Sequence, residues 1–252
     1  MSENRNIYET VEFDAWAYKE GIGYEEKFLC KKYLNKDLKT VEAGTGGGRL
    51  ILEMKKLGFT SLYAYDYLPE FIAEAKKKDP TQSICFEVED ATKLSYQDCS
   101  FEQILYLQQL ISSIDGDDNK LKALKEAYRI LKQGGIALFS FLSFESRVRE
   151  PLYIPYLVYL FAFRKLLRIN RSIQYLPWLK LGGKPNFLSL LDSEPYVYWY
   201  KMSEAYNQLE QVGFKVVAFG SSYQMSQGIL YSDLESSVNQ PIKGGIYFVC
   251  TK

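Results

Sequence analysis

The sequence predicts an α/β fold in which a doubly wound, mostly parallel sheet carries helices on both faces. Short apolar segments alternate with amphipathic helical segments through most of the 252 residues, which is the pattern of successive βαβ units. A turn with four glycines joins the first strand to a helix at 44–48. Carboxylates stand at or just after the ends of the first three strands, at Glu42, Asp66 and Asp90. Parallel strands end at one edge of a sheet, so we expect these acids to lie near the glycine turn.

The glycine turn reads Glu42-Ala43-Gly44-Thr45-Gly46-Gly47-Gly48-Arg49. Glycine tolerates positive φ and lets a ligand approach the backbone closely. A helix with an apolar face follows, and Gly58 stands where a C-cap glycine is typical. Strand-turn-helix units of this kind bind either dinucleotides or S-adenosylmethionine (SAM). Arg49 occupies the place of the third glycine in the dinucleotide pattern G-x-G-x-x-G, so the spacing favours SAM.

The other expected elements follow in an alternating order. Residues 1–24 are rich in aromatic side chains, which form either a flap over a bound nucleoside or a terminal helix docked by its aromatic rings. Further helices are expected at 25–34, 70–78, around 121–131 and at 203–212. Further strands are expected at 61–66, 83–88, up to 107, and at 136–141, 214–219 and 246–251.

Composition places the chain among globular proteins. Hydrophobic residues make up 47% of it, and 31 basic residues balance 31 acidic ones, which does not favour a nucleic-acid partner. The first thirty residues lack the apolar core of an export signal, so a cytoplasmic location is expected. The absence of histidine excludes a histidine general base, a histidine-containing triad and a histidine-ligated metal. The four cysteines lack C-x-x-C spacing, so we expect neither a metal site nor a disulfide frame.

Five landmarks occur in one order along about 100 residues. They are E-x-G-x-G-x-G at 42–48, the acid at 66, E-D-A at 89–91, D-C-S-F-E at 98–102 and L-K-Q-G-G at 131–135. This series resembles the class I SAM-dependent methyltransferases of the small-molecule type, with methyltransferase domain 11 or 25. The resemblance implies a Rossmann-like, seven-stranded sheet in the order 3-2-1-4-5-7-6, in which the last two strands are antiparallel. It also implies an enzyme that uses SAM to methylate a small molecule.

The resemblance assigns roles to residues at the strand ends. Glu42 would reach the amino end of SAM through backbone or water, Asp66 would bind the ribose, and Asp90 the adenine amino group. Tyr67 would stack on the adenine, and the main chain near Leu107 would close the pocket. The full set implied to bind the cofactor is Glu42, Gly44, Thr45, Gly46, Gly48, Arg49, Asp66, Tyr67, Asp90, Ala91, Leu107 and Gln108.

No catalytic base is evident. Methyltransferases of this class often have histidine after the fourth strand, where this chain has Ile111 and Ser112. Gln108, Gln109 and Ser112 are therefore candidates for positioning the acceptor, or else polar residues at a helix end that touch no substrate. Methyl transfer needs little covalent help, because holding the reactants in line can supply about 7–11 kcal/mol.

Residues 143–198 break the alternating pattern and are predicted to form a helical lid, embedded in a single domain of residues 1–252. They hold five of the eight prolines, eleven aromatic residues, and eight basic against four acidic residues. Arg164, Arg168 and Arg171 would share one face of a helix, forming either a fork for an acidic, partly apolar acceptor or an interfacial helix on anionic lipid. Three prolines, Pro151, Pro155 and Pro177, would divide the segment and so favour the lid.

The alternative function is a methyltransferase-fold protein with little catalysis that uses residues 151–171 to bind a partner or a membrane surface. The apolar run 151–163 is about 20 Å long as a helix, too short to cross a bilayer core of about 30 Å. Peripheral membrane contact therefore stays open as an expectation. The sequence does not identify the acceptor atom or an oligomeric state.

Overall fold

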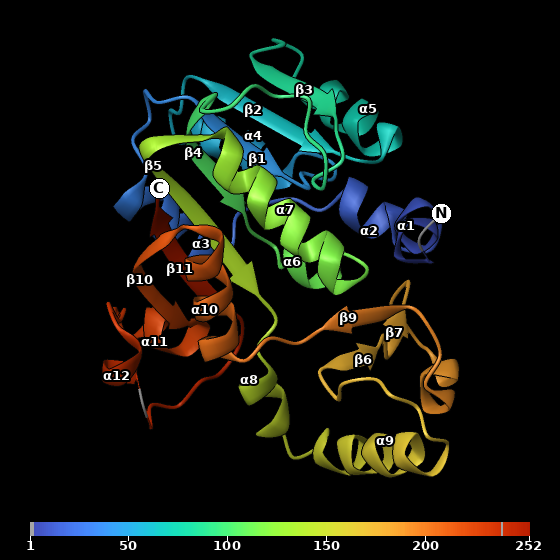
Figure 1. Cartoon of the computed structure of the whole chain (residues 1–252). Helices are drawn as coiled ribbons and strands as arrows, with labels where there is room; N and C mark the ends of the chain where they lie inside the picture. The colour runs from blue at the N-terminus through green and yellow to red at the C-terminus, as the bar shows by residue number, and fades with distance from the viewer. Residues whose placement is uncertain (1–2, 238) are drawn as a thin grey trace.

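The structure is a computed structural model that describes residues 3–237 and 239–252. Its centre is a seven-stranded sheet in the order β10-β11-β5-β4-β1-β2-β3 (Figure 1). The strands are β1 Thr40–Ala43, β2 Leu62–Asp66, β3 Ile84–Val88, β4 Phe101–Tyr106, β5 Leu131–Phe141, β10 Lys215–Ser221 and β11 Ile246–Thr251. Strands β1 to β5 are mutually parallel, and β11 is antiparallel to both of its neighbours. With β10 as the sixth strand and β11 as the seventh, the expected order 3-2-1-4-5-7-6 is confirmed.

Each face of the sheet buries its own hydrophobic core, because side chains of a strand alternate between the two faces. On β4, Ile104 and Tyr106 enter one core, while Leu105 enters the other. The helices α7 Asp117–Ile130 and α10 Met202–Val212 cover the first core. The second core lies under α3 Tyr24–Tyr33, α4 Arg49–Lys56, α5 Pro69–Lys77 and α11 Ser222–Ser226. This two-sided cover is the predicted doubly wound arrangement.

The fifth strand begins earlier than the sequence predicts. Leu131 already pairs with Phe101, and the register shifts before Gln103 pairs with Ile136. Gly134 takes φ of 74°, so the L-K-Q-G-G segment forms an irregularity within β5 rather than a turn before it.

The N-terminal segment forms two short helices, α1 Glu3–Glu9 and α2 Phe13–Ala17. They pack beside α5, where the rings of Phe13 and Phe71 stack with centroids 5.1 Å apart. In Figure 1 both helices lie at the edge of the molecule near the short helix α6 Leu110–Ser113. The aromatic rings therefore dock this helical segment on the main body. Two of them, Tyr8 and Trp16, also line the cavity at the strand ends, where the other expectation placed a flap.

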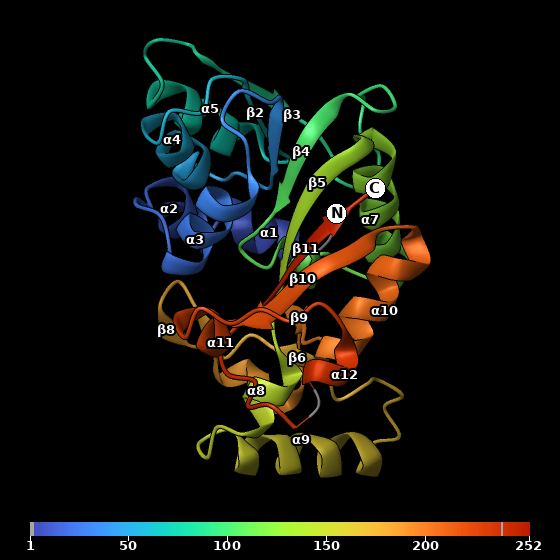
Figure 2. The same ribbon diagram turned by 90° about the vertical axis from the view of Figure 1, so that its left-hand side faces the viewer.

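The chain between β5 and α10 forms a separate lobe, which lies beyond the sheet in both Figure 1 and Figure 2. It has a small core of its own, made by Leu157, Leu160 and Leu176. The sequence predicts a helical insertion here, and the lobe contains helices and, in addition, short strands. Its elements are α8 Phe144–Val148, α9 Ile154–Leu166, β6 Tyr175–Pro177, β7 Lys180–Leu181, β8 Lys184–Pro185, the 3-10 helix η1 Phe187–Leu191 and β9 Tyr196–Tyr198.

A last short helix, α12 Leu234–Ser237, lies between β10 and β11. Across residues 3–237 and 239–252, no helix combines the length and the apolar character that a membrane crossing requires.

Candidate functional site

The glycine turn is built by contacts on both of its sides. Gly46 has φ of 53°, and its N–H donates to Asp66 Oδ2 at 2.9 Å. Gly47 N–H donates to the carbonyl of Trp16 at 3.2 Å, which ties the turn to α2. A Cβ on Gly44 would lie 2.7 Å from Leu110 Cδ1. The turn therefore needs glycine for close approach as well as for its backbone angles.

A cavity of about 330 Å³ opens where β1 to β4 end. Of the twelve residues expected to bind the cofactor, eight line it: Gly44, Gly46, Asp66, Tyr67, Asp90, Ala91, Leu107 and Gln108. The volume is within the range of about 300–1,000 Å³ that is usual for small-molecule sites. The carboxyl edge of the sheet thus brings together most of the residues that the sequence indicated.

Asp66 is fixed in the wall of this cavity. Its Oδ2 accepts from Gly46 N–H and its Oδ1 from Leu68 N–H, at 2.9 and 3.1 Å. Burial raises the pKa of Asp66 to about 6, although these two hydrogen bonds lower it. Each carboxylate oxygen can accept further hydrogen bonds, so Asp66 can receive two neighbouring hydroxyl groups.

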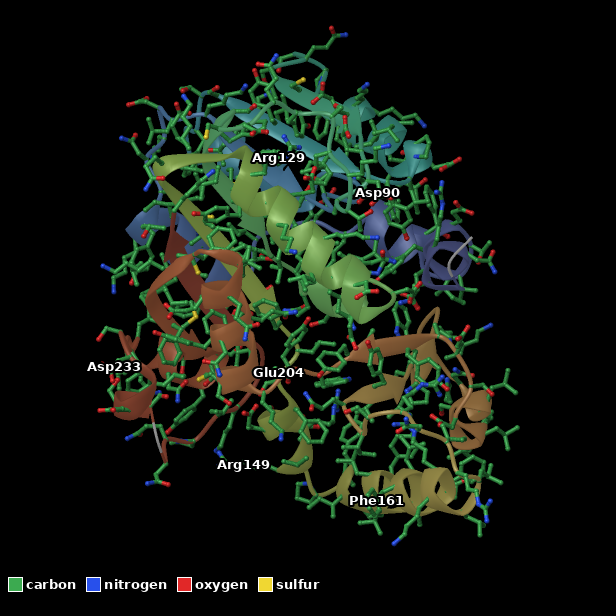
Figure 3. The ribbon with its side chains drawn as sticks, in the orientation of Figure 1. Asp90, Arg129, Arg149, Phe161, Glu204 and Asp233 are labelled. Carbon is green, nitrogen blue, oxygen red and sulfur yellow. The ribbon has the colours of Figure 1, made fainter. Side chains whose placement is uncertain are left out.

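Asp90 differs from Asp66 in its surroundings. It is exposed, and its Oδ1 accepts from the N–H and the hydroxyl of Thr92, at 2.8 and 2.7 Å. Figure 3 labels Asp90 beside the N-terminal helices. Tyr67 is half-buried, and the guanidinium of Arg5 lies 5.3 Å from the centre of its ring.

Four of the expected cofactor residues, Glu42, Thr45, Gly48 and Arg49, do not line the cavity. Glu42 is 1% exposed, and its Oε2 accepts from the Thr45 hydroxyl at 2.7 Å and from Ile51 N–H at 3.1 Å. Burial raises the pKa of Glu42 to about 8. Glu42 and Thr45 therefore brace the turn from behind, and Gly48 is its left-handed last residue, with φ of 82°.

Arg49 points away from the cavity. Its guanidinium forms an ion pair with Glu26 and donates to the carbonyl of Gly21 at 2.7 Å. It also donates to Gln108 Oε1 at 3.2 Å, and Gln108 Nε2 donates to Glu42 Oε1 at 3.3 Å. Arg49 and Glu42 thus orient a residue that does line the cavity.

The three candidates for positioning the acceptor, Gln108, Gln109 and Ser112, have different surroundings in the structure. Only Gln108 lines the first cavity. Gln109 lines neither of the two cavities described here, and its N–H donates to Ser140 Oγ at 2.9 Å. Ser112 Oγ accepts from Leu142 N–H at 3.0 Å and so joins α6 to the end of β5.

A second cavity, of about 680 Å³, lies between the start of α7 and the lobe. Tyr175, Tyr196 and Tyr198 of the lobe contribute to its wall, together with Arg171 and Ser112. Both cavities share three lining residues, which are Asn4, Ile114 and Asp115. The two cavities are therefore neighbours.

Two buried acceptor atoms mark the boundary of the cavities. Asn4 is 4% exposed, and its Nδ2 donates to the carbonyls of Ser113 and Tyr196 at 2.8 and 3.0 Å. Its Oδ1, like Asp115 Oδ2, is buried and has no hydrogen-bond partner among the residues described. Sequence reasoning missed both residues, although Asp115 stands in the acidic segment Asp115-Gly116-Asp117-Asp118, which begins between α6 and α7.

The expected arginine fork is wrong. Helix α9 ends at Leu166, and Arg168 takes φ of 56° beyond it, so the three arginines do not share a helical face. Arg164 is buried and donates twice to Asp192, at 2.6 and 2.8 Å, and also to the carbonyls of Ser172 and Tyr175. The lobe therefore uses Arg164 to hold itself together.

Residues 41–139 match the family model described as a methyltransferase domain. The demethylmenaquinone methyltransferase of Chlorobaculum parvum is 31% identical over 99 residues, 39% of each chain. The ubiquinone/menaquinone biosynthesis C-methyltransferase UbiE of Bdellovibrio bacteriovorus is 33% identical over 98 residues, 38% of this chain and 40% of that protein. The chain thus spans about two fifths of the length of these curated relatives.

Solved structures share the fold over nearly the whole chain. A SAM-dependent methyltransferase from Methanosarcina mazei has a TM-score of 0.66 at 20% identity and covers 89% of this chain and 96% of its own. A possible histamine N-methyltransferase from Thermotoga maritima has a TM-score of 0.56 at 17% identity, with 99% and 97% covered. These likenesses confirm the fold and, with the domain match, the resemblance to class I SAM-dependent methyltransferases.

Proposed function

We propose that the chain methylates a small acceptor with SAM. The premise is that it carries a methyltransferase domain in the class I fold. The observation that carries the proposal is the pair of neighbouring cavities. The first would hold the cofactor at the strand ends, and the second would hold the acceptor under the lobe 143–198, which would act as its lid.

The first cavity suits SAM. Asp66 keeps acceptor capacity for a ribose diol, and the glycines at 44 and 46 let a ligand approach the backbone. By analogy with other proteins of this fold, the adenine would contact Asp90 and Ala91, just after the end of β3. When bound, SAM supplies an activated methyl group. The chain's own contribution is to hold the two reactants in line and to exclude water.

The second cavity indicates what kind of acceptor fits. Three tyrosine rings offer an apolar surface, while Asn4 Oδ1 and Asp115 Oδ2 each need a hydrogen-bond donor. We therefore propose a partly apolar molecule that presents an N–H or O–H group at the junction of the cavities. Asp115 would receive the hydrogen bond of that group and orient it, in a chain that has no histidine to do so.

Replacing Asp115 by Asn is expected to lower kcat/KM for the acceptor by about tenfold to a hundredfold, because a charge-assisted hydrogen bond contributes about 1.5–3 kcal/mol. The affinity for SAM should change less than threefold, roughly 0.6 kcal/mol. Release of S-adenosylhomocysteine would be followed with a panel of phenols, catechols, primary amines and demethylmenaquinol. Demethylmenaquinol, the reduced form of demethylmenaquinone, is included because a curated relative is named demethylmenaquinone methyltransferase.

Asp118→Asn is the matched control, because Asp118 is an exposed neighbour that lines neither cavity. Equal losses in both variants would contradict the role given to Asp115. Tight SAM binding with no turnover on any member of the panel would instead favour a binding protein with little catalysis.

A further inference from the structure

The outer surface of the lobe is strongly apolar. Six large side chains on and beside α9 and η1 are between 60% and 91% exposed: Leu152, Val158, Phe161, Leu166, Phe187 and Leu191. We call these six residues the apolar face. The two elements that carry it are joined, because the Tyr156 and Tyr159 hydroxyls donate to the carbonyls of Ser189 and Leu190, at 3.0 and 2.6 Å.

Helix α9, which carries Val158, Phe161 and Leu166 of the apolar face, lies on the side of the lobe away from the sheet. Figures 1 and 2 both place α9 at the end of the molecule opposite the sheet. Figure 3 labels Phe161 on this outer helix. The second cavity is lined by 169–172, 175 and 194–198 instead, so the apolar face is a different surface from the proposed acceptor site.

Helix α9 is apolar on both of its sides. Leu157 and Leu160 are buried in the core of the lobe, while Val158 and Phe161, one position later, are exposed. A helix on the surface of a globular protein normally turns polar side chains outward, and a helix that is apolar all round is normally covered. Monomeric soluble proteins rarely expose contiguous apolar patches larger than a few hundred Å², and larger patches mark interaction sites.

The charge of the same segment selects the partner. Residues 151–191 contain six Lys and Arg residues and no Asp or Glu. Arg164 and Arg171 bind Asp192. Lys165 and Arg168, at the end of α9, are exposed and form no ion pair within the part of the chain that the structure describes. An apolar face with cations beside it is the composition that binds the interface of anionic membranes.

A second copy of the chain fits this surface less well. A two-fold dimer brings the same patch of both copies together, so Lys165 and Arg168 of each copy would face the same cations of the other copy. The flanking acids Glu150 and Asp192 already pair with arginines of their own copy. A bilayer with anionic headgroups offers the complementary charge. Because α9 has 13 residues, about 20 Å, it would lie in the interface rather than cross the bilayer.

The prolines do not oppose this arrangement, contrary to the sequence expectation. Pro155 lies in the first turn of α9, where proline is well tolerated. Pro151 precedes the helix, and Pro177 belongs to β6. The helix is therefore continuous. We propose that the apolar face docks the protein on the surface of anionic membranes, whether or not the site catalyses methyl transfer.

Vesicle flotation tests this proposal with the full chain. We expect the wild type to float with vesicles of phosphatidylcholine and phosphatidylserine, and to do so less with phosphatidylcholine alone or at high salt. Phe161→Ser together with Leu166→Ser should abolish flotation. Lys165→Gln together with Arg168→Gln should weaken it about tenfold to thirtyfold, since each cation near such a surface contributes about 1 kcal/mol.

Lys122→Gln together with Lys125→Gln is the matched control, because it removes two exposed charges from α7 in the main body and should leave flotation unchanged. Thermal unfolding of each variant checks that the fold is retained. The proposal is overturned if the wild type stays with the unbound fraction in both vesicle types. It is also overturned if Phe161→Ser with Leu166→Ser converts a dimer to a monomer in sedimentation without any vesicle binding.

Discussion

Replacing Asp66 by Asn is expected to weaken SAM binding by about tenfold to a hundredfold. The carboxylate would receive two ribose hydroxyls, and each charge-assisted hydrogen bond is worth about 1.5–3 kcal/mol before water replaces it. Gly46 N–H and Leu68 N–H donate to different oxygens of Asp66, so Asn keeps an acceptor for one of them, whereas Ala would keep none and would disturb the turn more. Titration calorimetry with SAM measures the loss.

Asp90→Asn is the comparison, and we expect it to weaken SAM binding less than Asp66→Asn does. Asp90 is exposed, and its carboxylate would accept a single hydrogen bond, from the adenine amino group. Asn at this position would remove only the charge that strengthens this bond. An equal or larger loss for Asp90→Asn would contradict the roles assigned to the two acids.

The contribution of Asp66 to SAM binding should also depend on pH. Its pKa in the folded protein is raised to about 6, so the carboxylate becomes protonated as the pH falls through that value. SAM affinity of the wild type should therefore decline below about pH 6, while the affinity of Asp66→Asn stays nearly level. A wild-type affinity that does not change across this range would count against the assignment.

Replacing Gly47 by Ala is expected to detach the N-terminal helices from the glycine turn. A Cβ on Gly47 would lie 1.9 Å from the carbonyl oxygen of Ala17 and 2.6 Å from its carbonyl carbon. These are backbone atoms, so the clash can be relieved only if α2 or the turn moves. Trp16 and Tyr8, which line the first cavity, would move with it.

We expect residues 3–17 to lose protection in hydrogen exchange and SAM affinity to fall by at least about tenfold, or 1.4 kcal/mol. Gly228→Ala is the control. Gly228 has φ of 73°, and the space around an added Cβ is open. Any change in this variant therefore reports backbone strain without a steric clash. Unchanged protection of residues 3–17 in Gly47→Ala would show that α2 does not pack on the turn.

The parts of the fold that sequence could predict are those encoded locally. The glycine turn, the acid that ends β2 and the acid just after β3 are each set within a few residues, and parallel pairing brings them to one edge. The positions of Asp66 and Asp90 at the first cavity were therefore accessible without a structure. The strand order followed from resemblance.

The missed features depend on partners that are distant in the chain. Arg164 meets Asp192, 28 residues later, and Arg49 meets Glu26, 23 residues earlier. No spacing rule indicates such pairs, so the sequence assigned both arginines to ligands and did not indicate these ion pairs within the chain. Asn4 reaches the cavities from the N-terminus through the carbonyls of Ser113 and Tyr196, a contact that only tertiary structure creates.

The exposure of the apolar face also depends on contacts between residues that are distant in the chain. The sequence 151–163 is apolar, and apolar residues are normally buried. Only the packing of α9 on Leu176 shows that one side of the helix is covered and the other is not. Local sequence identified the segment, and its tertiary contacts decided which surface is free.

The central claim, that the glycine turn and the acids at the strand ends bind SAM, is tested most directly by calorimetry on the wild type. SAM, S-adenosylhomocysteine and NAD would be titrated in turn. The account predicts saturable binding of SAM and S-adenosylhomocysteine and none of NAD, because Arg49 stands where a dinucleotide site has its third glycine and is held by Glu26. Tight binding of NAD with no binding of SAM would contradict it.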